Sequence, residues 1–211
     1  MRSSKSARGF VVVTGPDGSG KSTLAAAAAD ELHARGVSCE IVNFRPHLVD
    51  RARSRSKRAV RKIAAADPHA TVQLSRASAI GKCLVIFVDL VLGAWRWQRR
   101  SAVSGHCVLV ERYAYDLVVD PHRLGISRAP RRFRAVLARS APAPRAILLC
   151  TVDAETAVRR KPELHVAEVA RQYGEWSRTD FRSSKVPFGR LDMGGDIASA
   201  VEQVLGFYGL E

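Results

Sequence analysis

The chain has 211 residues, of which 46% are hydrophobic and 26% are charged, and this length suits one α/β domain but not two full domains. The apolar share excludes general disorder, and the formal net charge of +14 favours an anionic partner, whether a small molecule, a nucleic acid or a membrane surface. Cys39, Cys83, Cys107 and Cys150 form no C-x-x-C pair, which argues against zinc and thioredoxin-type sites and favours reduced thiols in a cytoplasmic protein.

The N-terminal part of the chain predicts a strand, a helix and a second strand. Residues 1–8 are polar and basic, lack an apolar stretch of signal-peptide length, and predict a flexible N-terminus. Gly9–Thr14 is a β-branched run without alternation, which predicts a parallel strand buried on both faces. Ser22–Arg35 is alanine-rich and predicts a helix ended by Gly36, and Val37–Asn43 predicts the next strand. Together these segments predict a βαβ unit.

The middle of the chain is first basic and then apolar. Asp50–Ala66 predicts a helix, and its Arg51–Lys62 cluster of basic residues favours a solvated helix face over a nucleic-acid contact. Ala79–Trp97 is the most apolar stretch, but Lys82 and two other charged residues interrupt it, so we predict no membrane span. One face at helical spacing predicts burial in the core or in a dimer interface: Leu84, Phe87, Val88, Val91, Leu92 and Trp95.

The C-terminal half alternates between predicted strands and helices. Strands are predicted over Gly105–Val110, Ala146–Thr151 and Pro187–Met193, and helices over Arg131–Arg139, Ala154–Arg160, Glu163–Tyr173 and Asp196–Phe207. This alternation predicts a single α/β domain over residues 1–211, with a mostly parallel sheet flanked by helices on both faces.

The turn after the first predicted strand carries a phosphate-binding motif. Gly15–Ser22, with the sequence GPDGSGKS, fits G-x-x-x-x-G-K-[ST] between a hydrophobic strand and a helix. Such a loop turns backbone N–H groups toward phosphate oxygens at a helix N-terminus. We therefore expect ATP and Mg²⁺ as cofactors, with Lys21 on the β- and γ-phosphates and Ser22 on the metal. The expected nucleotide contacts are Gly15, Asp17, Gly18, Ser19, Gly20, Lys21, Ser22 and Thr23.

A second acidic element follows the strand predicted at Gly105–Val110. Phosphoryl transfer needs magnesium held at the β- and γ-oxygens, and a carboxylate at the end of a second buried strand supplies a ligand. Glu111 stands at that position and is the expected partner of Ser22, while Asp120 follows only a mixed segment. Arg112 adds a cation at the edge of the sheet where α/β proteins bind ligands.

The glycine loop, Glu111-Arg112-Tyr113 and the basic turn after the strand at Ala146–Thr151 together resemble the thymidylate kinase-like family of P-loop nucleoside monophosphate kinases. The resemblance covers most of the chain in order. It implies that Asp17 faces the acceptor sugar, that Arg112 contacts substrate phosphate, and that Tyr113 belongs to the substrate site. The family has aspartate where this chain has Glu111, which keeps the charge but lengthens the reach.

The same resemblance implies a lid and an acceptor side. The lid would span about residues 154–175, with Arg160 closing over the donor. Arg45 would bind the acceptor phosphate, since a planar guanidinium suits bidentate phosphate contact. Arg76 would stand at the start of the helix that carries acceptor-base contacts. Family members are often dimers, so a homodimer is expected.

These features predict an ATP-dependent kinase for a small phosphoryl acceptor, with Lys21, Asp17, Arg112 and Arg160 as its catalytic residues. The first candidate acceptor is dTMP, followed by other pyrimidine monophosphates and then by a nucleoside or a sugar. The segment Tyr113–Arg123 also resembles thymidylate kinase-like proteins that accompany glycan biosynthesis, which leaves a specialised kinase-like role open. Further alternatives are an ATPase or switch associated with a polyanion, motivated by the net charge, and a degenerate kinase that only binds nucleotide.

Overall fold

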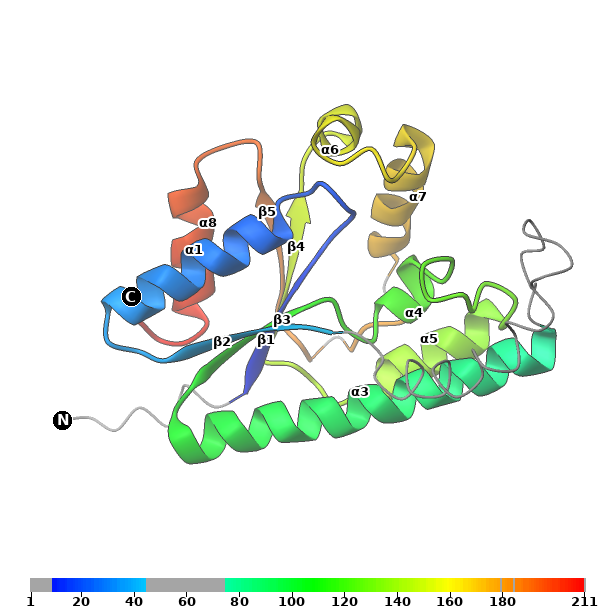
Figure 1. Ribbon diagram of the computed structural model, residues 1–211, viewed down its shortest axis with the longest axis horizontal. Coiled ribbons are helices and arrows are strands. Elements are labelled where there is room, and N and C mark those ends of the chain that lie inside the picture. The colour runs from blue at the N-terminus through cyan, green and yellow to red at the C-terminus, as the bar shows by residue number, and fades with distance from the viewer. Residues whose placement is uncertain (1–8, 45–74, 179, 184, 211) are drawn as a thin grey trace, which may run out of the picture.

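The central sheet confirms the α/β class predicted from the sequence. The computed structural model describes residues 9–44, 75–178, 180–183 and 185–210. Its five strands are all parallel, lie in the order β2-β3-β1-β4-β5, and have helices on both faces (Figure 1). The strands are β1 (Phe10–Thr14), β2 (Cys39–Asn43), β3 (Cys107–Glu111), β4 (Ala146–Thr151) and β5 (Phe188–Asp192). Each strand therefore lies where the pattern of buried apolar runs predicts it.

The helices follow the predicted segments closely. They are α1 (Lys21–Ala34), α3 (Arg76–Ser104), α4 (Asp116–Val119), α5 (Arg131–Ser140), α6 (Ala154–Arg160), α7 (Val166–Trp176) and α8 (Ile197–Gly206). The short helix α4 was not predicted from the sequence. Arg45 and the predicted helix at Asp50–Ala66, with its Arg51–Lys62 cluster, lie outside the described residues.

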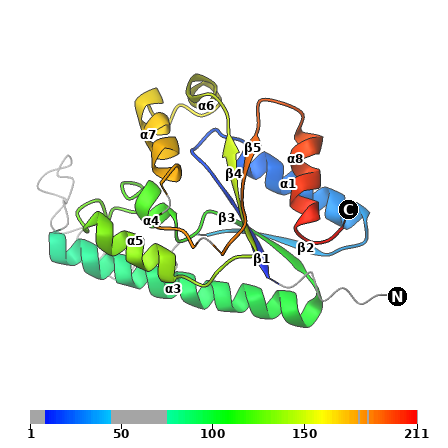
Figure 2. The ribbon, with the colours of Figure 1, turned by 180° about the vertical axis from the view of Figure 1, so that it is seen from behind.

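Alternate residues of the inner strands face two separate hydrophobic layers. Phe10 and Val12 of β1 pack in the layer that contains α3, α4 and α5, whereas Val11 and Val13 pack in the layer of α1 and α8. Side chains alternate along a strand, so a strand that is covered on both faces needs apolar residues at every position. Figure 2 shows the same two layers from behind, with α1 and α8 on one side of the sheet and α3 on the other.

The face of α3 that packs on the sheet is not the face predicted from the sequence. The buried residues of this helix include Cys83, Ile86, Leu90, Ala94 and Trp97. The predicted face is largely in solvent, and the exposed residues on it are Leu84, Val88, Leu92 and Trp95. The helix is apolar on more than one side, so periodicity did not identify the side that packs in this core, and a dimer interface on the predicted face stays a prediction. The face that packs on the sheet carries both small and large side chains, such as Ala94 and Trp97.

The length of α3 also bears on the prediction that the chain has no membrane span. Within the described part of the chain, α3 is the one helix whose length and apolar composition would allow it to cross a membrane. Its most apolar window is 33% buried, and the helix packs along the sheet. A buried core helix passes the same test, so the absence of a membrane span stays a prediction.

The helices α6 and α7 lie beyond the carboxyl ends of the strands (Figure 1). The residue before α6, Asp153, accepts a hydrogen bond of 2.8 Å from the Thr156 backbone N–H and so caps the helix. α6 and α7 form a small hydrophobic cluster of their own around Ala157 and Val169. Figure 1 shows α6 above the loop between β1 and α1 and α7 beside it, above α4, in the region predicted as a lid.

Candidate functional site

The glycine loop joins β1 to α1 and is fixed in a tight curl. The φ angles of Gly15 and Gly18 are 144° and 82°, values that favour glycine. A Cβ atom on Gly18 would collide with the Ala157 carbonyl oxygen of α6, and one on Gly15 would collide with the Cys150 carbonyl oxygen. These positions therefore require glycine. The loop ends at the N-terminus of α1, where unpaired backbone N–H groups and the helix dipole attract an anion.

Lys21 is buried at the start of α1 and turns back onto the loop. Its ammonium group donates a hydrogen bond to the Pro16 carbonyl oxygen and lies 3.8 Å from Asp17 Oδ1. Burial and the nearby Arg112 guanidinium lower the pKa of Lys21 from 10.5 to about 8, and the Asp17 carboxylate offsets part of this shift. An anionic phosphate in the adjoining cleft would favour the charged form.

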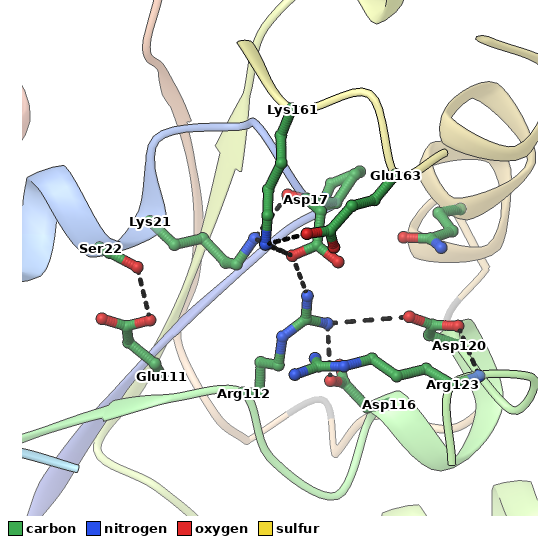
Figure 3. Close-up of polar contacts among 12 residues, drawn as sticks. Asp17, Lys21, Ser22, Glu111, Arg112, Asp116, Asp120, Arg123, Lys161 and Glu163 are labelled. Atoms are coloured by element: carbon green, nitrogen blue, oxygen red, sulfur yellow. Dashed lines mark hydrogen bonds and ion pairs between the residues drawn. The ribbon is translucent and has the colours of Figure 1, made fainter. Parts of the chain in front are cut away.

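Ser22 lies beside a carboxylate of the neighbouring strand. Glu111 stands at the end of β3, opposite Val13 of β1 in the parallel ladder. The Ser22 hydroxyl donates a hydrogen bond of 2.9 Å to Glu111 Oε2, and Asn43 Nδ2 lies 3.4 Å from the same oxygen. The loop, β3 and β2 thus bring together three polar side chains at one edge of the sheet (Figure 3 shows Ser22 and Glu111).

These oxygen donors suit a magnesium ion. The described residues contain no group of three or more His, Cys, Asp or Glu side chains that could hold a metal. Mg²⁺ does not need such a group, because it is commonly bound through one or two protein oxygens together with substrate phosphates and water. The hydroxyl of Ser22 and the carboxylate of Glu111 fit that donor set, and a magnesium ion held by them stays a prediction.

Arg112 is the centre of a buried ionic cluster. Its guanidinium lies 2.5 Å from Asp17 Oδ1, 3.1 Å from Asp116 Oδ2 and 3.8 Å from Asp120 Oδ2. The side chain is only 5% exposed. Burial alone would lower the pKa of Arg112, but these carboxylates raise it, so the residue stays charged. Figure 3 shows the guanidinium between Asp17 on the loop and the two aspartates after β3.

The carboxylates of this cluster have different electrostatic surroundings. Burial raises the pKa of Asp17, but Arg112 and Lys21 outweigh it, and the net pKa lies below the usual value. Asp17 is therefore ionised at neutral pH. Burial and the neighbouring Asp116 raise the pKa of Asp120.

The backbone at Arg112 adopts a conformation that is uncommon for a residue with a side chain. Its φ angle is 67°, and it is the one non-glycine residue with positive φ in the described ranges. Such a conformation costs of order 1–3 kcal/mol and persists only where its surroundings fix it. Here the three ion pairs fix it, and the chain turns sharply after β3 so that α4 presents Asp116 to the arginine. Strain of this kind is concentrated at functional sites.

The lid region reaches the loop through basic side chains. Lys161 Nζ, just after α6, lies 3.9 Å from Asp17 Oδ1 and 3.1 Å from Glu163 Oε1. The Arg160 guanidinium lies 3.5 Å from the Met193 carbonyl oxygen after β5. Because α6 passes directly above Gly18, both residues border the space in front of the loop.

Two adjoining cavities occupy this edge of the sheet. The larger has a volume of about 470 Å³, and Lys21, Ser22, Glu111, Arg112 and Arg160 are among its lining residues. Its walls also include Asp17, Gly18, Gly20 and Thr23, so most of the predicted nucleotide contacts surround one space. The other two predicted contacts, Gly15 and Ser19, are buried residues of the loop that line neither cavity. A smaller cavity of about 350 Å³ shares Asp17 and Arg123 with the first.

Two of the predicted acceptor residues, Tyr113 and Arg76, lie away from this site, and Arg45 lies outside the described residues. Tyr113 is 2% exposed and packs against Phe10 and Tyr115, and its hydroxyl donates a hydrogen bond of 2.7 Å to the Pro142 carbonyl oxygen. The turn at Arg112 points Tyr113 into the core, so the predicted substrate contact is wrong and its role is structural. Arg76 is exposed in the first turn of α3 and lines neither cavity.

Several residues at the site were not predicted. Asn43, Asp116, Asp120, Arg123 and Lys161 all line a cavity or contact a residue that does. The aspartates carry a signal in the sequence, because Arg112, Asp116 and Asp120 follow one another at intervals of four residues. That spacing is typical of one face of a helix, but only Asp116 lies in α4, and the contacts of Arg112 depend on the turn that its positive φ angle creates.

Comparison with known proteins adds no relative at this point. No protein-family model matches the chain, and no curated protein matches it either. The functional conclusion therefore rests on the geometry of the site.

Proposed function

We propose that this protein is an ATP-dependent phosphotransferase, which moves the γ-phosphoryl group of ATP to a small acceptor. The observation that carries the proposal is the 2.9 Å hydrogen bond between Ser22 Oγ and Glu111 Oε2. A glycine turn without a nucleotide role has no need of a carboxylate from the adjacent strand. A magnesium site at a phosphate-binding loop requires this combination of hydroxyl and carboxylate.

The proposed mechanism depends on positioning and charge neutralisation. Lys21 and the N-terminus of α1 would bind the β- and γ-phosphates, and Ser22 and Glu111 would hold the metal. Magnesium, when bound, neutralises charge on the phosphate oxygens. Arg160 and Lys161 border the same cavity and would counter charge that develops as the phosphoryl group leaves ADP.

Water must be kept away from the donor, because it would otherwise accept the phosphoryl group. The helix α6 stands over the loop with α7 beside it (Figure 1), and the Lys161–Asp17 ion pair of 3.9 Å joins the end of α6 to the loop. This arrangement supports the lid role expected for residues 154–175. We propose that nucleotide binding draws the lid residues toward the phosphates.

The resemblance to thymidylate kinases makes a nucleoside monophosphate, with dTMP first, the acceptor that this family would use. It also makes a cytoplasmic homodimer the expected form of the protein. Both remain part of the proposal. The shared position of Asp17, which lines both cavities, supports an acceptor next to the nucleotide.

Equilibrium binding of MgATP tests the proposal, with ADP formation as the second readout. The Lys21→Ala variant should lose both, because it removes the buried cation of the loop. Lys185→Ala is the matched control, since Lys185 is an exposed lysine of another region and its loss should leave both unchanged. Failure of the wild-type protein to bind MgATP would refute the proposal. ATP hydrolysis stimulated only by polyanions, and lost steeply with salt, would favour the polyanion-linked ATPase instead.

A further inference from the structure

The cavity beside the nucleotide cleft contains chemistry that the proposed function has not used. Its volume is about 350 Å³, and among the described residues its polar lining consists of Asp17, Asp120, His122, Arg123, Glu163 and Glu168. Asp17 and Arg123 also line the larger cleft in front of the loop. A molecule in the smaller cavity would therefore lie next to a nucleotide in the larger one, with these two side chains at the border between them.

The lining offers many hydrogen-bond acceptors and few donors. Four of its residues are carboxylates, and an ionised carboxylate can only accept hydrogen bonds. Two of them are fixed in place, since Glu168 bonds to Arg171 at 2.7 and 2.8 Å and Glu163 lies 3.1 Å from Lys161. Hydroxyl and ammonium groups can donate to such a wall. A phosphate monoester, whose second pKa is about 6, offers it no donor when doubly ionised.

Of the two arginines expected to contact substrate phosphate, Arg112 is already occupied, and Arg45 lies outside the described residues. Arg112 is surrounded by Asp17, Asp116 and Asp120 and is almost fully buried. Turning it toward another anion would leave buried carboxylates without their partner, which is strongly destabilising. Arg123 is the remaining arginine of the lining, and it stands at the border with the nucleotide cleft. Figure 3 shows its side chain directed back toward Arg112.

We infer that the smaller cavity is the acceptor site, and that its acceptor presents a hydroxyl group and carries no phosphate of its own. The chemical class is a neutral or amine-bearing polyhydroxyl compound, such as a nucleoside or a sugar. This inference rests on the proposed phosphotransferase function and changes the acceptor that the family resemblance implies.

The transfer step is then a displacement at the γ-phosphorus. The acceptor hydroxyl oxygen forms a new bond to this atom, and the bond to the β,γ-bridging oxygen breaks, with ADP leaving with the electron pair. The hydroxyl proton passes to the Asp17 carboxylate, which lines both cavities and is ionised at neutral pH. Arg123 lines the same border and would counter charge on the group in transfer.

Pairs of acceptors that differ only in one phosphate provide the test. ADP formation from MgATP would be measured with thymidine and dTMP, glucose and glucose 6-phosphate, and glucosamine and glucosamine 6-phosphate. We expect at least one unphosphorylated member to stimulate ADP formation more than its phosphorylated partner. If every phosphorylated member were at least as effective as its partner, or if no member stimulated a protein that binds MgATP, the inference would be overturned. Absence of MgATP binding would instead overturn the proposed function.

A variant of the cavity wall gives a second readout. Glu163→Gln should raise KM for the preferred hydroxyl acceptor by roughly tenfold, the loss expected for one hydrogen bond to a charged group. The KM for ATP should change much less. Glu155→Gln is the matched control, because Glu155 is an exposed glutamate of α6 outside both cavities. Equal KM values for Glu163→Gln and Glu155→Gln would contradict the assignment of the cavity.

Discussion

The protonation state of Lys21 depends on whether an anion occupies the cleft in front of the loop. It is buried beside another cation, Arg112, and has one carboxylate, Asp17, at 3.8 Å. Burial and Arg112 together lower its pKa to about 8. Bound phosphates would add several negative charges near the ammonium group and would raise the pKa again. Nucleotide binding should therefore be coupled to uptake of a proton by Lys21.

This coupling predicts a pH dependence of MgATP affinity. The pKa is lower in the free protein than in the complex, so affinity is full below about pH 8 and falls as pH rises through and above that value. The decrease should approach about tenfold per pH unit until the pKa of the complex is reached. Titration calorimetry at a series of pH values would measure it.

The Lys21→Ala variant is the control for this measurement, since any MgATP binding that it retains should lack the decrease. A wild-type affinity that stays constant as pH rises from about 7 to about 10 would show that Lys21 is not the titrating contact.

Some residues of the site can be predicted from the sequence, and others cannot. Glu111 and Arg112 directly follow a buried strand, and parallel strand ends meet at one edge, so their position near the loop is predictable. Asp116, Asp120 and Arg123 depend on the turn that the positive φ angle of Arg112 creates. That angle has no local signal in the sequence, because arginine does not normally adopt it. The same turn explains why Tyr113 is buried rather than in the substrate site.

The position of helix α3 is predicted correctly from the sequence, but the face that packs in the core is not. Leu90 is 1% exposed on the face that packs against the sheet, whereas Leu92 is 43% exposed on the opposite side. Both faces of the helix are apolar, and periodicity cannot choose between them. The choice follows from which side chains fit against β1 and β3, a property of the packed core.

A pair of leucine substitutions tests this orientation. Leu90→Ala should lower the free energy of unfolding by about 2–5 kcal/mol, the range for a buried leucine, because it leaves a cavity in the core. Leu92→Ala should cost less than about 1 kcal/mol, since an exposed leucine buries little surface. Urea denaturation monitored by circular dichroism would give both values.

Similar losses for the two variants would contradict the orientation described for α3, or would show that a second surface covers the Leu92 side. Comparing the denaturation midpoints at two protein concentrations would separate these explanations, because a homodimer becomes more stable as concentration rises.

At the scale of the whole molecule, strand order creates the site. β1 lies between β3 and β4, so the loop after β1 has Glu111 on one side and the lid that follows β4 on the other. The alternation of helices and strands predicts the α/β class and a ligand site at this edge. It does not predict the shape of the second cavity, because Asp17, Asp120 and Glu163 come from separate loops whose approach depends on the complete fold.

Nucleotide binding should stabilise the entire domain. At a ligand concentration of about 100 times Kd, binding contributes about 2.7 kcal/mol to the folded state. For a chain of this size that gain corresponds to an increase in Tm of roughly 5–10 °C, at about 2–4 °C for each kcal/mol. Differential scanning fluorimetry with and without MgATP would measure the shift. Lys21→Ala should show almost none, and an equal shift in that variant would place the bound nucleotide elsewhere.

The most direct test of the central claim is to follow the γ-phosphoryl group itself. ATP labelled at the γ-phosphate would be incubated with the protein, magnesium and the acceptor pairs, and the labelled products would be separated. The structure predicts that the label moves to an acceptor in the wild-type protein and remains on ATP in Lys21→Ala. Label found only as inorganic phosphate, or retained on ATP by the wild-type protein with every acceptor, would contradict a phosphotransferase.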